Sequence, residues 1–293
     1  MKKKYKVIIF GGSGFLGSHL SDLLSKKNFN VTIFDIKQKK QKTKSINFIK
    51  GSITNKKKIL QILKGYDYVF NFAAISDIAK ANIDPVKTIN QNFLGNVNIL
   101  EAIKKQKNVK RFIFASSIYA ISSQGEFYSS TKRSSENIIE NYSNKYGLKF
   151  SILRYGSIYG TRTNSLNAIH NFILQGMYTK KIVRKGLGNE VRSYINVKDA
   201  AKITHKILDK KFQNKYINII GKNKLKVREV INIIKNKLNL KKIVFKKNEK
   251  LQYHYNKSPY SYKLIRGITI SPKQPIPLKK GLDEIINELN VKS

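Results

Sequence analysis

The sequence predicts an α/β fold in which a doubly wound parallel sheet is joined to a smaller C-terminal α/β lobe. Short runs rich in β-branched and aromatic residues alternate with amphipathic runs as far as Tyr155, and small residues follow several of the apolar runs. Beyond Gly160 the alternation loosens. Alternation of strand and helix is typical of a parallel sheet with helices on both faces.

The first expected strand, residues 4–10, runs into three glycines, Gly11, Gly14 and Gly17, and a helical pattern then begins near Phe15. Glycines in such a turn allow the backbone to approach a pyrophosphate, which the N–H groups and dipole of the helix start favour. The next apolar run, residues 31–34, ends at Asp35, whose carboxylate suits the ribose hydroxyls of a dinucleotide. The sequence therefore predicts a Rossmann site. NAD is favoured, because a 2′-phosphate would meet a carboxylate.

The remaining elements extend this sheet. We expect strands at residues 46–50, 68–74, 112–117 and 150–155, a helix near 59–63, and long helices at 85–105 and 128–146. Ligands of such sheets bind at the carboxyl ends of the strands, where Gly11, Asp35, Ala73 and Ser117 fall. Residues 1–160 are therefore the expected NAD-binding domain. Residues 161–293 are the expected substrate-binding lobe, with some of its elements returning to the sheet.

Tyr128 and Lys132 are one helical turn apart at the start of a long helix, shortly after a strand that ends in serines. The same spacing recurs at Tyr194/Lys198 and Tyr253/Lys257, so position decides in favour of the first pair. A free tyrosine titrates near pH ~10, too high for a base at neutral pH. A neighbouring ammonium and a positive nicotinamide ring would both favour the phenolate, by an expected shift of about three pKa units. A serine hydroxyl would hold the same substrate oxygen while the tyrosine accepts its proton.

The chain resembles the extended short-chain dehydrogenase/reductases, in particular the NAD-dependent epimerase/dehydratase family that acts on sugar nucleotides. The resemblance covers nearly the whole length. It rests on the glycine segment 11–17, Asp35 and residues 71–74, together with Asn92, Ser116–Ser117, Tyr128/Lys132, residues 153–160 and residues 191–197.

The resemblance implies three groups of functional residues. Ser117 would be the hydroxyl partner, Tyr128 the base and Lys132 the residue that holds the nicotinamide ribose. The cofactor-binding residues would be Gly11, Gly14, Phe15, Leu16, Gly17, Asp35, Ser52, Ile53, Ala73, Ala74, Asn92, Ser116, Tyr128, Lys132 and Tyr155. The substrate-binding residues would be Ser117, Tyr128, Ser157, Arg162 and Arg192, with the Arg192 guanidinium suited to a diphosphate.

This sequence departs from the family at several positions. Ser52 stands where the family usually has an acid near the adenine, Asn71 where histidine is common, and Ser157 where asparagine often meets the substrate. Dehydratases of the family tend to carry acids directly after the catalytic hydroxyl, whereas Ile118 and Tyr119 follow it here, although Glu126 lies nearby.

We therefore expect an NAD-dependent sugar-nucleotide epimerase, acting on a UDP-, GDP-, CDP- or dTDP-sugar. An NAD(P)-dependent ketosugar reductase and a sugar-nucleotide dehydratase are the enzymatic alternatives. A non-catalytic nucleotide-binding or RNA-binding member of the same fold is the third reading. By analogy with the family, we also expect a homodimer that pairs through the two long helices.

Net charge, cysteine content and histidine spacing bear on the possible partners, location and metal sites of the protein. The net charge of +41 would suit a nucleic acid or an anionic membrane. The lysines are spread along the whole chain, however, so we favour a general compositional bias, and nucleic acid is not an expected partner. The absence of cysteine excludes thiol catalysis and disulfides and fits a cytoplasmic protein. No run is long enough to span a membrane. The histidines 19, 170, 205 and 254 lack metal-ligand spacing, so no metal site is expected.

Overall fold

The structure is a computed structural model that describes residues 4–27, 29–38, 45–106, 108–122, 124–246 and 267–291. These residues form two compact units. Unit 1 contains the described residues within 4–155, 201–219 and 267–270, and unit 2 contains residues 156–200, 220–246 and 271–291. The chain therefore leaves the first unit after Tyr155 and returns to it twice.

Unit 1 is built on an eight-stranded sheet in the order β3-β2-β1-β4-β5-β6-β10-β13. Every neighbouring pair is parallel. The strands are β1 (Lys6–Phe10), β2 (Asn30–Asp35), β3 (Asn47–Lys50), β4 (Tyr68–Asn71), β5 (Arg111–Ser117), β6 (Phe150–Tyr155), β10 (Lys215–Ile219) and β13 (Ile268–Ile270). Strand order reverses between β1 and β4, which is where a doubly wound sheet binds its ligand. The expected fold class is confirmed.

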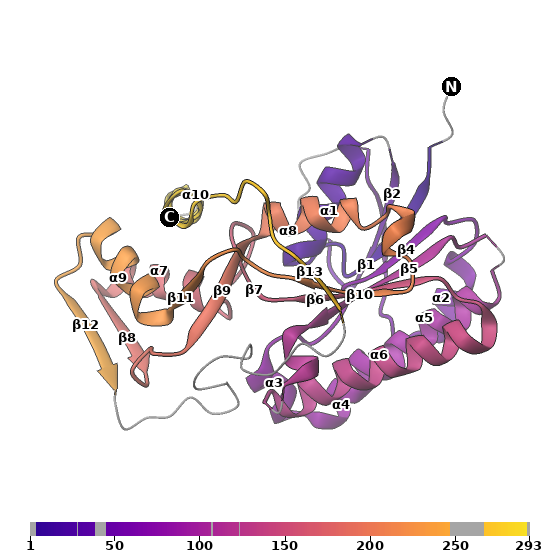
Figure 1. The fold of residues 1–293 in the computed structure, drawn as a ribbon, viewed down its shortest axis with the longest axis horizontal. Coiled ribbons are helices and arrows are strands. Elements are labelled where there is room, and N and C mark those ends of the chain that lie inside the picture. Colours follow the sequence, from indigo (N-terminus) through magenta and orange to yellow (C-terminus); the bar gives the residue numbers. More distant parts are fainter. Residues whose placement is uncertain are drawn as a thin grey trace. The chain divides into compact units, whose positions relative to one another are not determined.

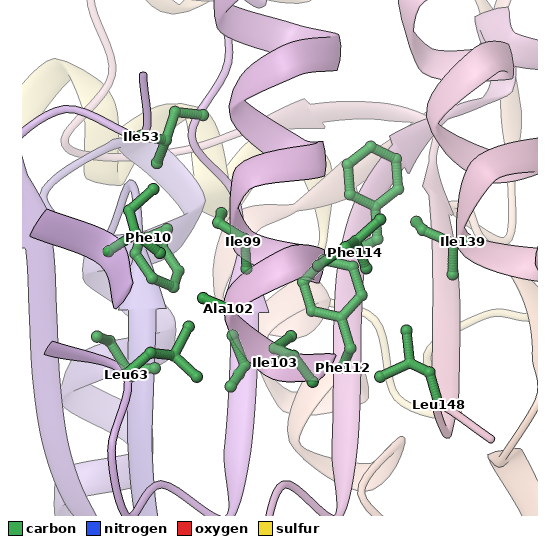
Figure 2. Packing of buried hydrophobic residues seen from close by; sticks show 14 of the residues in the cluster. Phe10, Ile53, Leu63, Ile99, Ala102, Ile103, Phe112, Phe114, Ile139 and Leu148 are labelled. Carbon is green, nitrogen blue, oxygen red and sulfur yellow. The ribbon is translucent and has the colours of Figure 1, made fainter. Parts of the chain in front are cut away.

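Helices cover the two faces of this sheet (Figure 1). Helix α1 (Phe15–Lys26) lies on one face, and α2 (Lys56–Ile62), α5 (Gly95–Lys104) and α6 (Glu126–Tyr146) lie on the other. Figure 2 shows the core on the second side, where helix residues such as Ile99, Ile103 and Ile139 pack near the sheet residues Phe112 and Phe114. All five are at most 3% exposed. Fully burying such a side chain contributes about 1.5–3 kcal/mol, so this layer holds the strand ends in place.

The helix expected at residues 85–105 is interrupted. It consists of α4 (Pro85–Ile89), a π-helical turn η1 (Asn90–Leu94) and α5. A further short helix, α3 (Ile78–Ile83), precedes it and was not expected. The Asp84 side chain caps the Lys87 N–H at 2.9 Å, and Pro85 occupies the first turn, so a new helix starts there. A π turn changes the direction of the side chains beyond it, and such turns often occur at functional sites.

Unit 2 contains two small sheets and three helices. One sheet has the order β11-β9-β7, from β7 (Ser157–Tyr159), β9 (Val191–Asn196) and β11 (Lys224–Lys226), and the other pairs β8 (Lys181–Lys185) with β12 (Lys242–Lys246). Helices α7 (Ala168–Thr179), α9 (Val227–Lys237) and α10 (Leu278–Asn290) bury Ile173, Ile231, Ile234, Leu282 and Ile285 in a core of their own. Helix α8 (Val197–Lys206) starts in unit 2 and ends in unit 1. Two 3-10 turns, η2 (Ile118–Ile121) and η3 (Lys210–Phe212), complete the described elements.

Candidate cofactor and active site

The glycine turn after β1 is packed so closely that side chains do not fit. Gly11 has a φ of +76°, and a Cβ there would lie 2.5 Å from the Ala73 backbone nitrogen. A Cβ on Gly17 would lie 2.3 Å from the Gly11 carbonyl oxygen. Helix α1 begins after Gly14 with no side-chain cap, so its first N–H groups are available to an anion. Gly11 and Ala73, which the sequence placed at two strand ends, thus meet at the expected pyrophosphate site.

Asp35 lies at the end of β2 beside this turn. Its Oδ2 accepts a hydrogen bond from the Ser13 N–H at 3.0 Å, and its Oδ1 accepts one from the Lys37 N–H at 3.4 Å. The carboxylate therefore holds the glycine turn, and its remaining lone pairs are those that would accept ribose hydroxyls. The Ser13 hydroxyl is buried in the same turn and has no hydrogen-bond partner among the described residues.

The segment after β4 is fixed by two asparagines. Asn71 Oδ1 accepts from the Ala73 N–H at 3.2 Å, while its Nδ2 donates to Asn96 at 2.9 Å. Asn92, in the π turn, accepts from the Ile75 N–H at 2.7 Å and donates to the Ile75 carbonyl at 3.1 Å. The Asn92 side chain is only 2% exposed. It fixes the backbone that follows Ala73 and Ala74, so it supports the cofactor site by placing that segment.

The three expected catalytic residues lie close together in unit 1. Ser117 ends β5, and its hydroxyl shares a hydrogen bond with the Tyr128 phenol. The Lys132 Nζ donates to the Ala115 carbonyl at 2.7 Å and lies 5.9 Å from the centre of the Tyr128 ring. An ammonium has three N–H groups, so two remain for a ribose. The structure therefore joins hydroxyl, phenol and ammonium at one strand end.

Burial is the largest influence on the pKa values of Tyr128 and Lys132. It raises the pKa of Tyr128 above its usual value, and the hydrogen bond from Ser117 offsets only part of the rise. It lowers the pKa of Lys132 to about 8, although the Glu136 carboxylate acts in the opposite direction. The sequence predicted a lowered pKa for Tyr128. In the protein alone desolvation is the larger effect, because a buried phenolate loses its hydration. A lowered pKa of Tyr128 would therefore require additional positive charge near the phenol, which the ring of oxidised NAD would supply when bound.

Two residues that the sequence analysis missed hold Tyr128 in position. The Ser129 hydroxyl donates to the Tyr119 carbonyl at 2.8 Å. The Arg133 guanidinium donates to the carbonyls of Ala120 and Ser122, each at 2.8 Å. Both fasten the short turn η2, which follows Ser117, to helix α6, which carries Tyr128. In the sequence, the feature that could have pointed to Ser129 and Arg133 is their position in the first turns of the helix that carries Tyr128.

Four other expected cofactor residues use their side chains within the protein. Ile53 packs in the core of Figure 2, and the Ser52 hydroxyl pairs with Thr54 at 2.8 Å. The Ser116 hydroxyl donates to Glu136 at 2.5 Å, and the Tyr155 phenol pairs with the Thr204 hydroxyl at 2.6 Å. Contacts from Ile53 and Ser116 to a cofactor would therefore run through the backbone. Phe15 and Leu16 open helix α1, where their N–H groups belong to its first turn.

The expected substrate residues of unit 2 are partly brought together. In the parallel β7–β9 pair Ser157 is in register with Tyr194, and Arg192 lies two residues before Tyr194. Alternate residues of a strand share a face, so Ser157 and Arg192 lie on the same face of this sheet. Both are partly exposed. Arg162 has a left-handed backbone, with φ at 61°, and its N–H donates to the Glu288 carboxylate at 2.7 Å.

The remaining features concern a second Tyr/Lys pair, the histidines, metal sites and membrane spans. Tyr253, Lys257 and His254 lie outside the described residues. His205 packs edge-on against Phe29, and burial lowers its pKa. Within the described residues no three histidine or acidic side chains are grouped to hold a metal ion. No helix in the described part of the chain has the length and apolar character needed to cross a bilayer.

The residues of unit 1 fit a bound dinucleotide. The close glycine turn, the uncapped start of α1 and the unpartnered Ser13 hydroxyl suit a pyrophosphate, and Asp35 suits the adenosine ribose. A hydroxyl, a phenol and an ammonium meet at the end of β5. Together with the strand order, these features define an NAD-dependent enzyme of the short-chain dehydrogenase/reductase class.

Comparison with known sequences specifies the family. The model of the family "NAD dependent epimerase/dehydratase family" matches residues 7–220. A Methanocaldococcus jannaschii protein named "Putative UDP-glucose 4-epimerase" is 27% identical, covering 96% of this chain and 97% of its own. A UDP-N-acetyl-alpha-D-glucosaminuronate decarboxylase of Bacillus cytotoxicus is 30% identical over 78% of each chain. The protein belongs to the NAD-dependent epimerase/dehydratase family.

The fold is also that of solved epimerases. The structure of a UDP-N-acetylglucosamine 4-epimerase from Methanobrevibacter ruminantium superposes with a TM-score of 0.86 at 22% identity, covering 99% of this chain and all of the other. At that identity the likeness shows the fold alone.

Proposed function

We propose that this protein is an NAD-dependent epimerase that inverts a hydroxyl-bearing ring carbon of a sugar nucleotide, with UDP-sugars as the first candidates. The observation that carries the proposal is the junction of Ser117, Tyr128 and Lys132 at the end of β5, within the family that the comparisons establish. The name of the M. jannaschii relative, "Putative UDP-glucose 4-epimerase", supports the substrate class, since the match covers nearly the whole of both chains.

In this proposal Ser117 donates a hydrogen bond to the oxygen of a hydroxyl group on the sugar ring, and Tyr128 accepts the proton of that hydroxyl while the carbon that bears it is oxidised. NAD, when bound, supplies the hydride acceptor. Lys132 would hold the nicotinamide ribose through the N–H groups that Ala115 leaves available, and its charge favours the phenolate of Tyr128. After the keto sugar has turned over, the same hydride would return to the opposite face of its carbon, and Tyr128 would return the proton to the oxygen. The cycle is redox-neutral.

The turn after Ser117 supports epimerisation over dehydration. Ile118 and Tyr119 directly follow Ser117, so neither of these two positions carries a carboxyl group. Elimination of water needs a further acid and base at the sugar. Unit 2 would supply the diphosphate contacts: we assign these to Arg192, with Ser157 on the same sheet face and Arg162 as an additional ligand.

We also propose that the protein is a homodimer that pairs through the helices at residues 85–105 and 128–146. Several large apolar side chains near or on them are exposed, namely Ile83, Val86, Leu94 and Phe127. An exposed group of this kind is typical of an interface.

The absence of cysteine supports a cytoplasmic location.

The test is a panel of UDP-, GDP-, CDP- and dTDP-sugars incubated with the purified protein, with products separated by ion-exchange chromatography before mass spectrometry. We expect at least one UDP-sugar to yield an epimer of unchanged mass with no net change in NADH absorbance. A product lighter by one water would indicate a dehydratase, and stoichiometric consumption of NAD(P)H would indicate a reductase. Salt-dependent RNA binding that survives Tyr128→Phe, without turnover of any sugar, would indicate the non-catalytic reading.

A further inference from the structure

Glu136 is a buried acid that the catalytic residues alone do not explain. It lies on α6 one turn beyond Lys132 and two turns beyond Tyr128, on the same face of the helix. The residue is 3% exposed. A buried carboxylate costs several kcal/mol unless it is paired and hydrogen-bonded, so its surroundings show what holds it there.

Two neighbouring strands hold the Glu136 carboxylate. Oε1 accepts from the Ser116 hydroxyl at 2.5 Å and from the Arg154 Nε at 2.9 Å, and Oε2 accepts from an Arg154 terminal nitrogen at 2.6 Å. Ser116 and Arg154 are register partners across β5 and β6. The Arg154 guanidinium also lies 4.5 Å from the centre of the Tyr216 ring on β10. The carboxylate is thus fixed against the sheet by three hydrogen bonds.

Lys132 is fixed by the neighbouring residue of the same strand. Its ammonium donates to the carbonyl of Ala115, which directly precedes Ser116. Lys132 is 4% exposed, and the negative charge of Glu136 opposes the loss of its proton that burial favours. Glu136 and Lys132 therefore lie on the same face of α6, carry opposite charges and bind adjacent residues of β5.

We propose that Glu136 is a positioning residue for the cofactor site: Ser116 and Arg154 fix its carboxylate one helical turn from Lys132, so that a negative charge stays beside the Lys132 ammonium. The proposal rests on the role assigned to Lys132 above. Without the carboxylate, Lys132 and Arg154, which are 4% and 5% exposed, would both lose the negative charge of Glu136.

Among the described residues, the charged and titratable groups near Lys132 or linked to it lie on its own helix and on the sheet. Its own helix contributes Tyr128 and Glu136, and Arg154 of β6 is linked to Lys132 only through the Glu136 carboxylate. Strand β5 contributes a carbonyl and the neutral Ser116 hydroxyl, and β10 contributes Tyr216, which hydrogen-bonds to Glu140. Of these, burial and Glu136 are the influences on the pKa of Lys132, so a change at Glu136 has a defined sign.

The experiment is the pH dependence of NADH affinity, followed by the fluorescence of the bound nucleotide between pH 6 and 10. It is independent of any sugar turnover, so failure of the proposed epimerisation and failure of this proposal are distinguishable. For the natural protein we expect affinity to fall as pH rises through about 8, where Lys132 loses its proton. In Glu136→Gln the midpoint of this fall should move to lower pH by at least about one unit, because an opposite charge nearby is lost. NADH would then bind about fivefold more weakly at pH 8.

Two further variants secure the interpretation. Glu140→Gln removes a carboxylate one turn further along α6 and should leave the midpoint unchanged. The double variant Glu136→Leu/Arg154→Met removes both partners of the ion pair, which is better tolerated by the fold than removal of one. It should shift the midpoint in the same direction as Glu136→Gln. An unchanged midpoint in folded Glu136→Gln, or in the folded double variant, would overturn the proposal, as would an equal shift in Glu140→Gln.

Discussion

The two units hold their candidate functional residues in different ways. In unit 1 the side chains of Ser117, Tyr128 and Lys132 are each at most 8% exposed and are tied to neighbouring strand or helix atoms. In unit 2 Ser157, Arg162 and Arg192 are partly exposed, on short strands or beside a left-handed turn. The difference is one of burial: the candidate catalytic side chains are enclosed by the protein, whereas the candidate substrate-binding side chains reach solvent.

The largest effect should come from the centre of unit 1. Tyr128→Phe removes the proposed base and keeps the ring, so kcat should fall by about a thousandfold while NADH still binds. Steady-state kinetics and a fluorescence titration check the two parts separately. Tyr142→Phe is the matched control, because that phenol lies on the same helix and donates to Glu101 at 2.5 Å. Comparable activity of the two variants would remove Tyr128 from the mechanism.

The next effect should come from the glycine turn. In Gly17→Ala the new Cβ would lie 2.3 Å from a backbone oxygen, so the turn has to shift. We expect the NADH affinity to fall by about a hundredfold, because a shift of the turn by about 1 Å would misplace the N–H groups that face the pyrophosphate. Gly147→Ala is the control: its φ of +71° makes alanine strained, but no atom lies within 4 Å. That variant should lose roughly 1 kcal/mol of stability and keep its NADH affinity.

In unit 2 the expected effect is on binding. Arg192→Ala should raise KM for the sugar nucleotide by about thirtyfold with kcat changed little, because a charge-assisted contact to the diphosphate contributes roughly 2 kcal/mol. Arg228→Ala, at an exposed position of α9, removes the same charge from the same unit and should leave KM unchanged. A fall in kcat without a change in KM would instead indicate a role in the chemical step.

The smallest effect should be at Asp35. Asp35→Asn should weaken NADH binding by about tenfold and reduce the preference for NADH over NADPH, because the repulsion of a 2′-phosphate is lost. Asp67→Asn is the control, since Asp67 also accepts a backbone N–H of this sheet, from Lys6 at 2.8 Å, but precedes β4. Titrations with both nucleotides measure the preference. An unchanged ratio in Asp35→Asn would leave cofactor choice to other residues.

Features that depend on local sequence patterns could be predicted, whereas contacts between residues far apart in the chain could not. The first six strands of the large sheet, the glycine turn, the place of Asp35 at a strand end and the juxtaposition of Ser117, Tyr128 and Lys132 were predictable, because local patterns and known spacing specify them. The ranges of β10 and β13 were not predicted, since the alternation of strand and helix loosens beyond Gly160. The π turn at Asn92 was not, since its bonds to Ile75 join residues far apart in the chain. The buried contacts of Glu136 also depend on strand register, which no local pattern reveals.

The pKa of Tyr128 shows a different limit. Sequence reasoning identified the neighbouring ammonium and predicted a lowered pKa. It could not weigh this charge against burial, which raises the pKa in the protein alone. In unit 2 the strands of the three-stranded sheet are short and the residues polar, so the pattern carried little information about the sheet face that Ser157 and Arg192 share.

One measurement tests the central claim most directly. The protein, with its bound NAD as the only cofactor, is incubated in D₂O with the UDP-sugar that it converts, and the epimer formed is examined by proton NMR. Oxidation and return of the same hydride predict that the inverted carbon keeps its original hydrogen and gains no deuterium. Deuterium at that carbon, or the absence of any epimer from a panel of UDP-sugars, would contradict the account.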